Sequence, residues 1–361
     1  MNQTVLVAMV LLLSAGPSAL AQARHVIAVT LDGFRWQELF EGASREIITS
    51  GAGGGADTTD LLRQFWRPSR EERRRALLPF FWSVVAERGQ LFGDSTAGST
   101  VRVVNGKRFS YPGYNELLTG KPDDRIDSND KVPNTNVTVL EWLNRRPGFR
   151  GQVIAIGSWD AMPFILNERR SGIPVNAAGL PYPSPKSPRQ RELNQFAADL
   201  PLLWSESRPD AVAFMLAREA LETKRPRVLY LMLEETDEWA HERRYDHYLD
   251  AARRTDRFLR QLWEWIERTP GYAGATALLI STDHGRGATK ESWIGHGRDE
   301  PASGRTWFAA LGAGVAARGV SHDSDAKQGQ FAATIAALLG EDFTTAGPGK
   351  AAPLPLGKAK R

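Results

Sequence analysis

The stretch from Val228 to Ser281 reads VLYLMLEETDEWAHERRYDHYLDAARRTDRFLRQLWEWIERTPGYAGATALLIS. It begins with the continuous apolar run VLYLML and ends with a second run, TALLIS; such runs are typical of strands buried on both faces of a sheet. Between them, apolar residues recur at the spacing of one helical face. These residues are Tyr245, Tyr248, Leu249, Ala252, Phe258, Leu259, Leu262 and Ile266. A strand, a helix and a second strand in this order predict two parallel strands joined by a crossover helix.

The rest of the chain repeats this alternation. Further buried strands are expected at HVIAVTL (25–31), VIAIG (153–157) and TWFAAL (306–311). A second clear helix spans KQGQFAATIAALLG (327–340) and stops at Gly340, a residue suited to a helix C-terminus. The predicted fold is therefore α/β, with a doubly wound, mainly parallel central sheet and helices on both faces.

The N-terminus differs from the rest of the chain. The short apolar run VLVAMVLLLSAG is followed by Ala19–Ala21, a pattern that predicts a signal peptide over residues 1–21, cleaved after Ala21. The alternative is an uncleaved membrane anchor, which the shortness of the run disfavours. We therefore expect a periplasmic or secreted protein with no membrane span after cleavage, one domain over residues 22–345 and a disordered tail over residues 346–361.

The charge and composition of the chain argue against nucleic acid as a binding partner. The 46 Lys and Arg residues outnumber the 42 Asp and Glu residues only slightly, which gives a net charge of +4. No stretch interleaves basic and aromatic residues in the manner of a nucleic-acid-binding surface. The chain has no cysteine, so it forms no disulfides. A chain of this size can be exported without them because its core is large enough.

Carboxylates and histidines follow three of the expected strands. In open α/β sheets, functional groups gather outside the carboxyl ends of the strands. The residues found there, with one histidine of the following GHG sequence, are Asp32, Asp237, His241, Asp283, His284 and His296. A single aspartate after a strand is more often a helix cap or turn former. Three carboxylates and three imidazoles together suit Zn²⁺ or Mn²⁺ and suffice for two ions.

Ser110 is a candidate nucleophile. It precedes YPGYNELLTG, which predicts a short helix with Pro112 in its first turn and Gly120 past its end. The helix dipole and direct bonding to a metal would both favour the serine alkoxide. The alternative is that Ser110 is only the N-cap of this helix, a position that serine often takes.

In this order, these residues resemble the alkaline phosphatase superfamily, and most closely its nucleotide pyrophosphatase/phosphodiesterases and cofactor-independent phosphomutases. The segments that carry the resemblance are VTLDGFRW, FSYPGYNELLTG, ETDEWAH, STDHGRG and GHG. The resemblance implies that one metal ion is held by Asp237, His241 and His296. It implies that Asp32, Ser110, Asp283 and His284 hold the other. It further implies an asparagine that contacts a phosphate oxygen, with Asn129 the first candidate and Asn134 the second. Lys107 is a further candidate for contacting a phosphate oxygen.

Two features depart from the phosphodiesterase pattern. Gly113–Tyr114 stands where those enzymes have Asn-His, and the step from His284 to His296 is short, as in the phosphomutases. We expect an exported phosphoesterase or phosphodiesterase with two divalent ions, zinc or alternatively manganese, acting on a small-molecule phosphate ester. The alternatives are a phosphomutase-type transferase and a non-catalytic metal-binding member. Monoesters, diesters, phospholipid headgroups and phosphonates all remain candidate substrates, and the oligomeric state is open.

Overall fold

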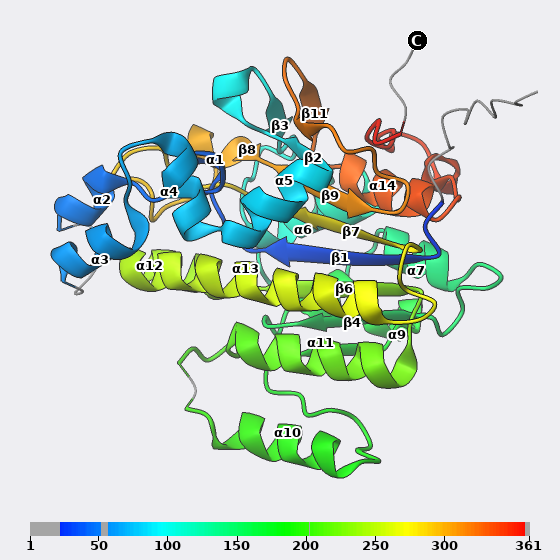
Figure 1. Ribbon diagram of the computed structural model, residues 1–361. Helices are drawn as coiled ribbons and strands as arrows, with labels where there is room; N and C mark the ends of the chain where they lie inside the picture. The colour runs from blue at the N-terminus through cyan, green and yellow to red at the C-terminus, as the bar shows by residue number, and fades with distance from the viewer. Residues whose placement is uncertain (1–21, 52–56, 202, 358–361) are drawn as a thin grey trace, which may run out of the picture.

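A computed structural model of the chain describes residues 22–51, 57–201 and 203–357, so the expected signal peptide lies outside the described residues. Its centre is an eight-stranded sheet in the order β10-β2-β9-β7-β1-β6-β4-β5 (Figure 1). The strands are β1 (His25–Leu31), β2 (Gly89–Phe92), β4 (Val153–Gly157), β5 (Val175–Ala177), β6 (Val228–Leu233), β7 (Thr276–Ser281), β9 (Phe308–Gly312) and β10 (Gly319–Val320). A small second sheet joins β3 (Thr100–Arg102), β8 (Arg305–Thr306) and β11 (Asp325–Lys327).

The central sheet is mainly parallel, as predicted. β1 pairs in parallel with both β6 and β7, and β6 also pairs in parallel with β4. β9 runs antiparallel to β7 and β2. The single strand expected over 306–311 is in fact two, because Trp307 separates β8 from β9. Trp307 is buried and donates a hydrogen bond from its indole nitrogen to the carbonyl of Phe34, so the chain passes from one sheet to the other at this residue.

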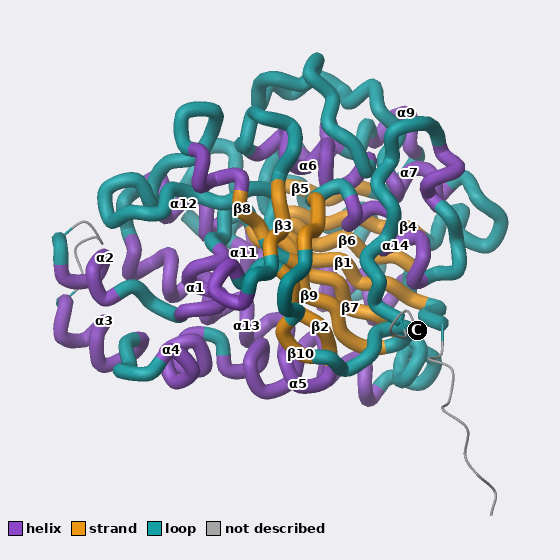
Figure 2. The backbone as a smooth tube through the Cα atoms, turned by 90° about the horizontal axis from the view of Figure 1, so that it is seen from above, coloured by secondary structure: helices purple, strands orange, loops and turns teal. Residues whose placement is uncertain are grey.

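Helices surround the sheet, whose strands run through the centre of the molecule in the view from above (Figure 2). They are α1 (Trp36–Glu41), α2 (Arg45–Thr49), α3 (Thr58–Phe65), α4 (Arg70–Leu77), α5 (Ala86–Arg88), α6 (Ser110–Thr119), α7 (Val139–Asn144), α8 (Met162–Ile165), α9 (Glu168–Ser171), α10 (Pro188–Asp199), α11 (Asp210–Lys224), α12 (Glu235–His241), α13 (Tyr245–Arg268) and α14 (Gln330–Leu338). Within the described residues, no helix is both long and apolar enough to cross a membrane.

The core consists of two apolar clusters, one on each face of the sheet. Alternate residues of β1 belong to different clusters: Ile27 and Val29 to one, Val26 and Ala28 to the other. The first cluster contains the buried faces of α11 and α13, and the second contains those of α6, α7 and α14. Continuous apolar strands are therefore explained by helices on both sides. The arrowhead of β1 points toward α1 and α12, which marks the edge where functional groups are expected (Figure 1).

The C-terminal segment differs from the expectation of disorder after residue 345. Leu354 and Leu356 are buried in the second apolar cluster. The backbone amide of Ala351 donates to the carbonyl of Gly120, and that of Ala316 donates to the carbonyl of Leu356. The expected disorder does not hold for residues 346–357, because two buried leucines and backbone hydrogen bonds hold this segment on the domain.

Candidate metal centre

Six predicted side chains gather in two groups at the carboxyl ends of β1, β6 and β7. The first group is Asp237, His241 and His296; the second is Asp32, Asp283 and His284. In each group, one potential ligand atom per residue lies within 4.8 Å of the others. Asp32 directly follows β1, and Asp283 follows β7 after one residue, so the register of neighbouring parallel strands brings these residues to one edge.

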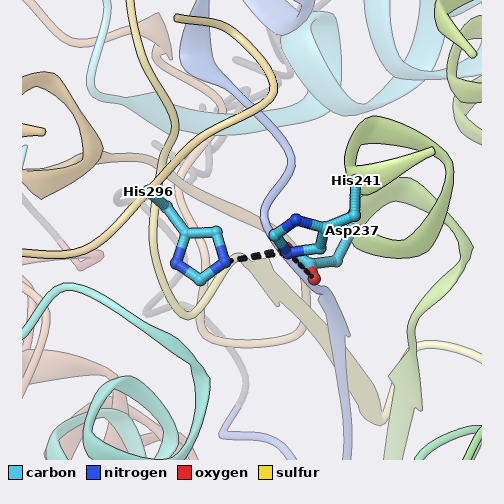
Figure 3. A group of neighbouring side chains, drawn as sticks. All are labelled: Asp237, His241 and His296. Atoms are coloured by element: carbon cyan, nitrogen blue, oxygen red, sulfur yellow. Dashed lines mark hydrogen bonds and ion pairs between the residues drawn. The ribbon is translucent and has the colours of Figure 1, made fainter. Parts of the chain in front are cut away.

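The first group converges on one point from two elements. His241 and Asp237 lie one turn apart on α12, and His296 comes from the loop after β7 (Figure 3). His241 Nε2 lies 3.0 Å from His296 Nε2 and 3.0 Å from Asp237 Oδ2. Two imidazole nitrogens and a carboxylate oxygen facing one another in this way form a donor set that suits a transition metal.

The second group is more deeply buried and adjoins the first. His284 Nε2 lies 3.3 Å from Asp32 Oδ1 and 3.5 Å from Asp283 Oδ2. It also lies 3.7 Å from Asp237 Oδ1, and the His284 and His296 rings stack with centroids 4.0 Å apart. The segment between His284 and His296, although short, therefore allows one histidine to lie in each group.

Three of the four carboxylate oxygens of Asp32 and Asp283 accept no hydrogen bond from a described residue; the fourth, Asp283 Oδ1, accepts one from the amide of Gly33. The three are both Asp32 oxygens and Asp283 Oδ2. Burial, followed by the charge of Asp237, raises the pKa of Asp32; burial, followed by the charge of Asp32, raises the pKa of Asp283. Burial opposes protonation of His284, but Asp283 and Asp32 raise its pKa to about 9. Unpartnered buried carboxylates side by side are costly without a cation, so the residues fit divalent metal ions.

Ser110 lies beside the second group. It is the first residue of α6, and Phe109 is the N-cap, with an extended backbone and no side-chain capping bond. Ser110 Oγ instead lies 3.4 Å from His284 Nε2. The interpretation of Ser110 as an N-cap is therefore wrong. Its hydroxyl contacts His284 of the second group rather than the end of its own helix.

Asn129, rather than Asn134, lies near Ser110. Asn129 Oδ1 accepts a hydrogen bond from the backbone amide of Tyr111, the residue after Ser110, at 3.0 Å. The exposed Asn129 Nδ2 group donates to no described residue. Asn134 is buried and donates to Asn115 Oδ1. Lys107 lies on the loop before Ser110, where its Nζ is 3.8 Å from Asp124 Oδ1.

The loop before Ser110 is held by a buried carboxylate on the same helix. Glu116 Oε2 accepts hydrogen bonds from the backbone amides of Val104 and Asn105 at 3.0 and 2.9 Å. Asn105 Oδ1 in turn accepts from the amides of Lys107 and Arg108. α6 itself approaches the Asp283 turn closely, since a Cβ atom on Gly113 would lie 2.6 Å from the Asp283 carbonyl oxygen. That approach is a physical reason for glycine at the first position of Gly113–Tyr114.

The helix that carries Asp237 is positioned by residues that the sequence analysis missed. Asp210, at the start of α11, accepts hydrogen bonds from the backbone amides of Glu234 and Glu235 at 2.8 and 3.1 Å. Glu235 Oε1 accepts one from the amide of Asp210 at 2.9 Å. The two carboxylates therefore cap each other's helices. Nothing in the local sequence links them, because they come from different strand–helix units.

Arg286 was also not predicted from the sequence, although it lies in STDHGRG, one of the segments that carry the family resemblance. It is 1% exposed, and its guanidinium contacts the Asp237 carboxylate. Burial opposes ionisation of Asp237, but Arg286 and then His241 hold its pKa well below the usual range. Gly33 packs on this pair, since a Cβ atom there would lie 2.6 Å from Asp237 Oδ1 and 2.8 Å from Arg286 Nε.

Comparisons with known proteins identify the family of the chain and structures of similar fold. The family model for type I phosphodiesterase / nucleotide pyrophosphatase matches residues 126–339. That range includes Asn129, Asp237, His241 and the histidines after β7, whereas Asp32 and Ser110 precede it. No curated protein matches the chain in sequence.

Solved structures of similar fold include two alkaline phosphatases and a lipoteichoic acid synthase. The lipoteichoic acid synthase LtaP from Listeria monocytogenes is 12% identical, with a TM-score of 0.56 over 92% of this chain and 74% of LtaP. A mutant of the alkaline phosphatase PafA is 11% identical, with a TM-score of 0.57 over 90% and 97% of the two chains. A mutant of TAB5 alkaline phosphatase is 12% identical, with a TM-score of 0.51 over 90% and 99%. At these identities the similarity is one of fold, and the fold is alkaline phosphatase-like.

Proposed function

The chain belongs to the type I phosphodiesterase / nucleotide pyrophosphatase family, and on this premise we propose that it hydrolyses phosphate esters with Ser110 as the nucleophile. The observation that carries the proposal is the position of Ser110 Oγ, 3.4 Å from His284 Nε2 in the second group. A hydroxyl needed only for helix capping would bond to the backbone of its own helix, and this one does not.

The two groups would hold two divalent ions, zinc or alternatively manganese. The first site would consist of Asp237, His241 and His296. The second would consist of Asp32, Asp283 and His284, with Ser110 Oγ as an additional oxygen donor. The unpartnered oxygens of Asp32 and Asp283 support this assignment. When bound, a pair of such ions supplies Lewis-acid stabilisation of charge on the attacking and leaving oxygens.

In the proposed reaction, Ser110 Oγ loses its proton to water and forms a bond to phosphorus as the bond to the ester oxygen breaks, and that oxygen leaves as an alcohol after taking up a proton. A water molecule then displaces Ser110 Oγ, which releases a phosphate or, from a diester, a phosphate monoester. The N-terminus of α6 favours negative charge on Ser110 Oγ, since the first amides of a helix lie there. Asn129 Nδ2 is proposed to donate to a non-bridging phosphate oxygen, because Asn129 Oδ1 is held by the Tyr111 amide. Lys107 is a second proposed contact.

Export is part of the proposal. The predicted signal peptide, residues 1–21, would place the mature enzyme in the periplasm or outside the cell, with residues 22–345 as its catalytic domain. Edman sequencing of the mature protein from a periplasmic fraction should begin at Gln22. A mature protein that retains Met1 would contradict this part alone.

The test is a screen of aryl phosphate monoesters and diesters with metal-free protein reloaded separately with Zn²⁺ and Mn²⁺. We expect turnover with free phosphate or a phosphate monoester as product, abolished by chelation and by Ser110→Ala, and partly retained by Ser110→Thr, which keeps a hydroxyl. Phosphate that stays on an organic product would instead indicate a phosphomutase-type transfer. An Ser110→Ala protein that turns over substrate like the parent would refute the nucleophile assignment. Metal binding without any turnover would indicate a binding protein.

A further inference from the structure

Arg286 is the one described Lys or Arg side chain within 4.0 Å of the Asp32, Asp237 or Asp283 carboxylates. It follows His284 by two residues and is almost completely buried. Its Nε atom is buried without a partner, while both terminal nitrogens are engaged. A fixed positive charge within a candidate metal centre requires a physical reason, because it repels a metal ion.

The contacts of Arg286 supply that reason. One terminal nitrogen, Nη2, donates to the Asp237 carbonyl oxygen at 3.1 Å and also to Asp237 Oδ1. The other, Nη1, donates to the carbonyl oxygen of Ile294, two residues before His296. A single planar side chain therefore joins α12, which carries Asp237 and His241, to the loop that carries His296.

The carboxylate geometry shows the consequence for the first group. With Oδ1 held by Arg286, Asp237 Oδ2 is the oxygen that lies 3.0 Å from His241 Nε2. Rotation of the carboxylate would move Oδ2 away from His241 Nε2. Gly33 closes the other side, since it leaves no room for a Cβ atom beside Asp237 Oδ1 and Arg286 Nε.

We infer that Arg286 is a positioning residue that pre-forms the first metal site by fixing Asp237 and the His296 loop with the two ends of its guanidinium. This inference rests on the proposed metal centre. Arg286 would thus determine the geometry of the first group without being a metal ligand itself. Hydrogen-bonded partners of metal ligands commonly change metal affinity by about 10–100-fold when removed. A lysine would keep the charge, but it lacks the planar fork that reaches both partners.

The test is Zn²⁺ binding by metal-stripped protein, measured by calorimetry and by competition with a chromophoric chelator. Wild type should bind two ions. Arg286→Ala should bind one of them about 10–100-fold more weakly and leave the other unchanged. The zinc affinity of this site in Arg286→Lys should lie between the affinities in wild type and in Arg286→Ala. Millimolar guanidinium should restore zinc binding at the weakened site of Arg286→Ala by filling the vacated space.

Arg254→Ala is the matched control. Arg254 also contacts a carboxylate of α12, that of Glu235, but Glu235 belongs to the helix cap and to neither group. This variant should melt earlier and bind both ions like wild type. The inference would be overturned if Arg286→Ala bound both zinc ions with wild-type affinity. It would also be overturned if Arg286→Ala bound both ions equally weakly, or if Arg254→Ala lost as much zinc affinity as Arg286→Ala. An Arg286→Lys protein that fails to fold would also overturn it. Wild type that binds no zinc would instead contradict the proposed function, and the inference with it.

Discussion

Gly33→Ala tests how tightly the first metal site is packed. Gly33 has φ +57°, a left-handed conformation that costs other residues about 1–2 kcal/mol. Part of this cost is offset because alanine reduces the conformational freedom of the unfolded chain, which stabilises the folded protein by about 0.4–1 kcal/mol. Backbone strain alone therefore destabilises the protein by about 1 kcal/mol.

The contact adds a second and larger cost. The new Cβ atom would lie 2.6 Å from Asp237 Oδ1 and 2.8 Å from Arg286 Nε, so one of these side chains must move. Removing one partner of a buried ion pair costs about 3–5 kcal/mol, and a partial displacement costs a share of this. We expect Gly33→Ala to lose at least about 2 kcal/mol in total and to weaken zinc binding at the first site.

Gly274→Ala is the control for backbone strain. Gly274 has φ +66°, and a Cβ atom there would meet nothing within 4 Å. Urea denaturation of both metal-free variants, beside zinc titrations, separates strain from contact. If both variants lose the same stability and Gly33→Ala binds zinc like wild type, the close packing of Gly33 on the Asp237–Arg286 pair has no energetic role.

Three further predictions concern other parts of the account. His241→Ala should lose one of two bound zinc ions and most activity while the fold persists, by elemental analysis and circular dichroism; full metal content would show that His241 is only a surface residue. Glu116→Gln should cost about 1–3 kcal/mol in urea denaturation, because an amide NH₂ would face the donors of the Asn105 loop; an unchanged midpoint would contradict the role of this carboxylate. Leu354→Ala should cost about 2–5 kcal/mol if residues 346–357 pack as described, and nothing if they are disordered.

The sequence predicted the central strands well because their apolar runs are continuous and bounded by polar residues. β1, β4, β6 and β7 have the bounds expected from those runs. Strands of two or three residues, such as β5 and β10, were missed because so few residues carry no periodic signal. The C-terminal segment was misjudged because glycine, proline and alanine dominate its composition, and its only large apolar side chains are the buried Leu354 and Leu356.

The residues of the candidate site were also predicted from the sequence only in part. Asp32, Asp283 and their partners were found because the ends of parallel strands meet at one edge, a rule that needs no three-dimensional information beyond strand order. Arg286 and Asp210 were missed because their partners lie far away in sequence, at Asp237 and Glu235. Their contacts arise only when two strand–helix units pack together. The same packing decided between the two interpretations of Ser110, since only the structure shows Phe109 at the N-cap.

The most direct test of the central claim is to trap phosphate on Ser110. Metal-loaded enzyme would be mixed with an excess of an activated aryl phosphate ester, quenched in acid during turnover, digested and examined by mass spectrometry. The account predicts one phosphate on the peptide that contains Ser110, present in wild type and absent from Ser110→Ala. Continued turnover by wild type with phosphate on no residue, or on a residue other than Ser110, would contradict it.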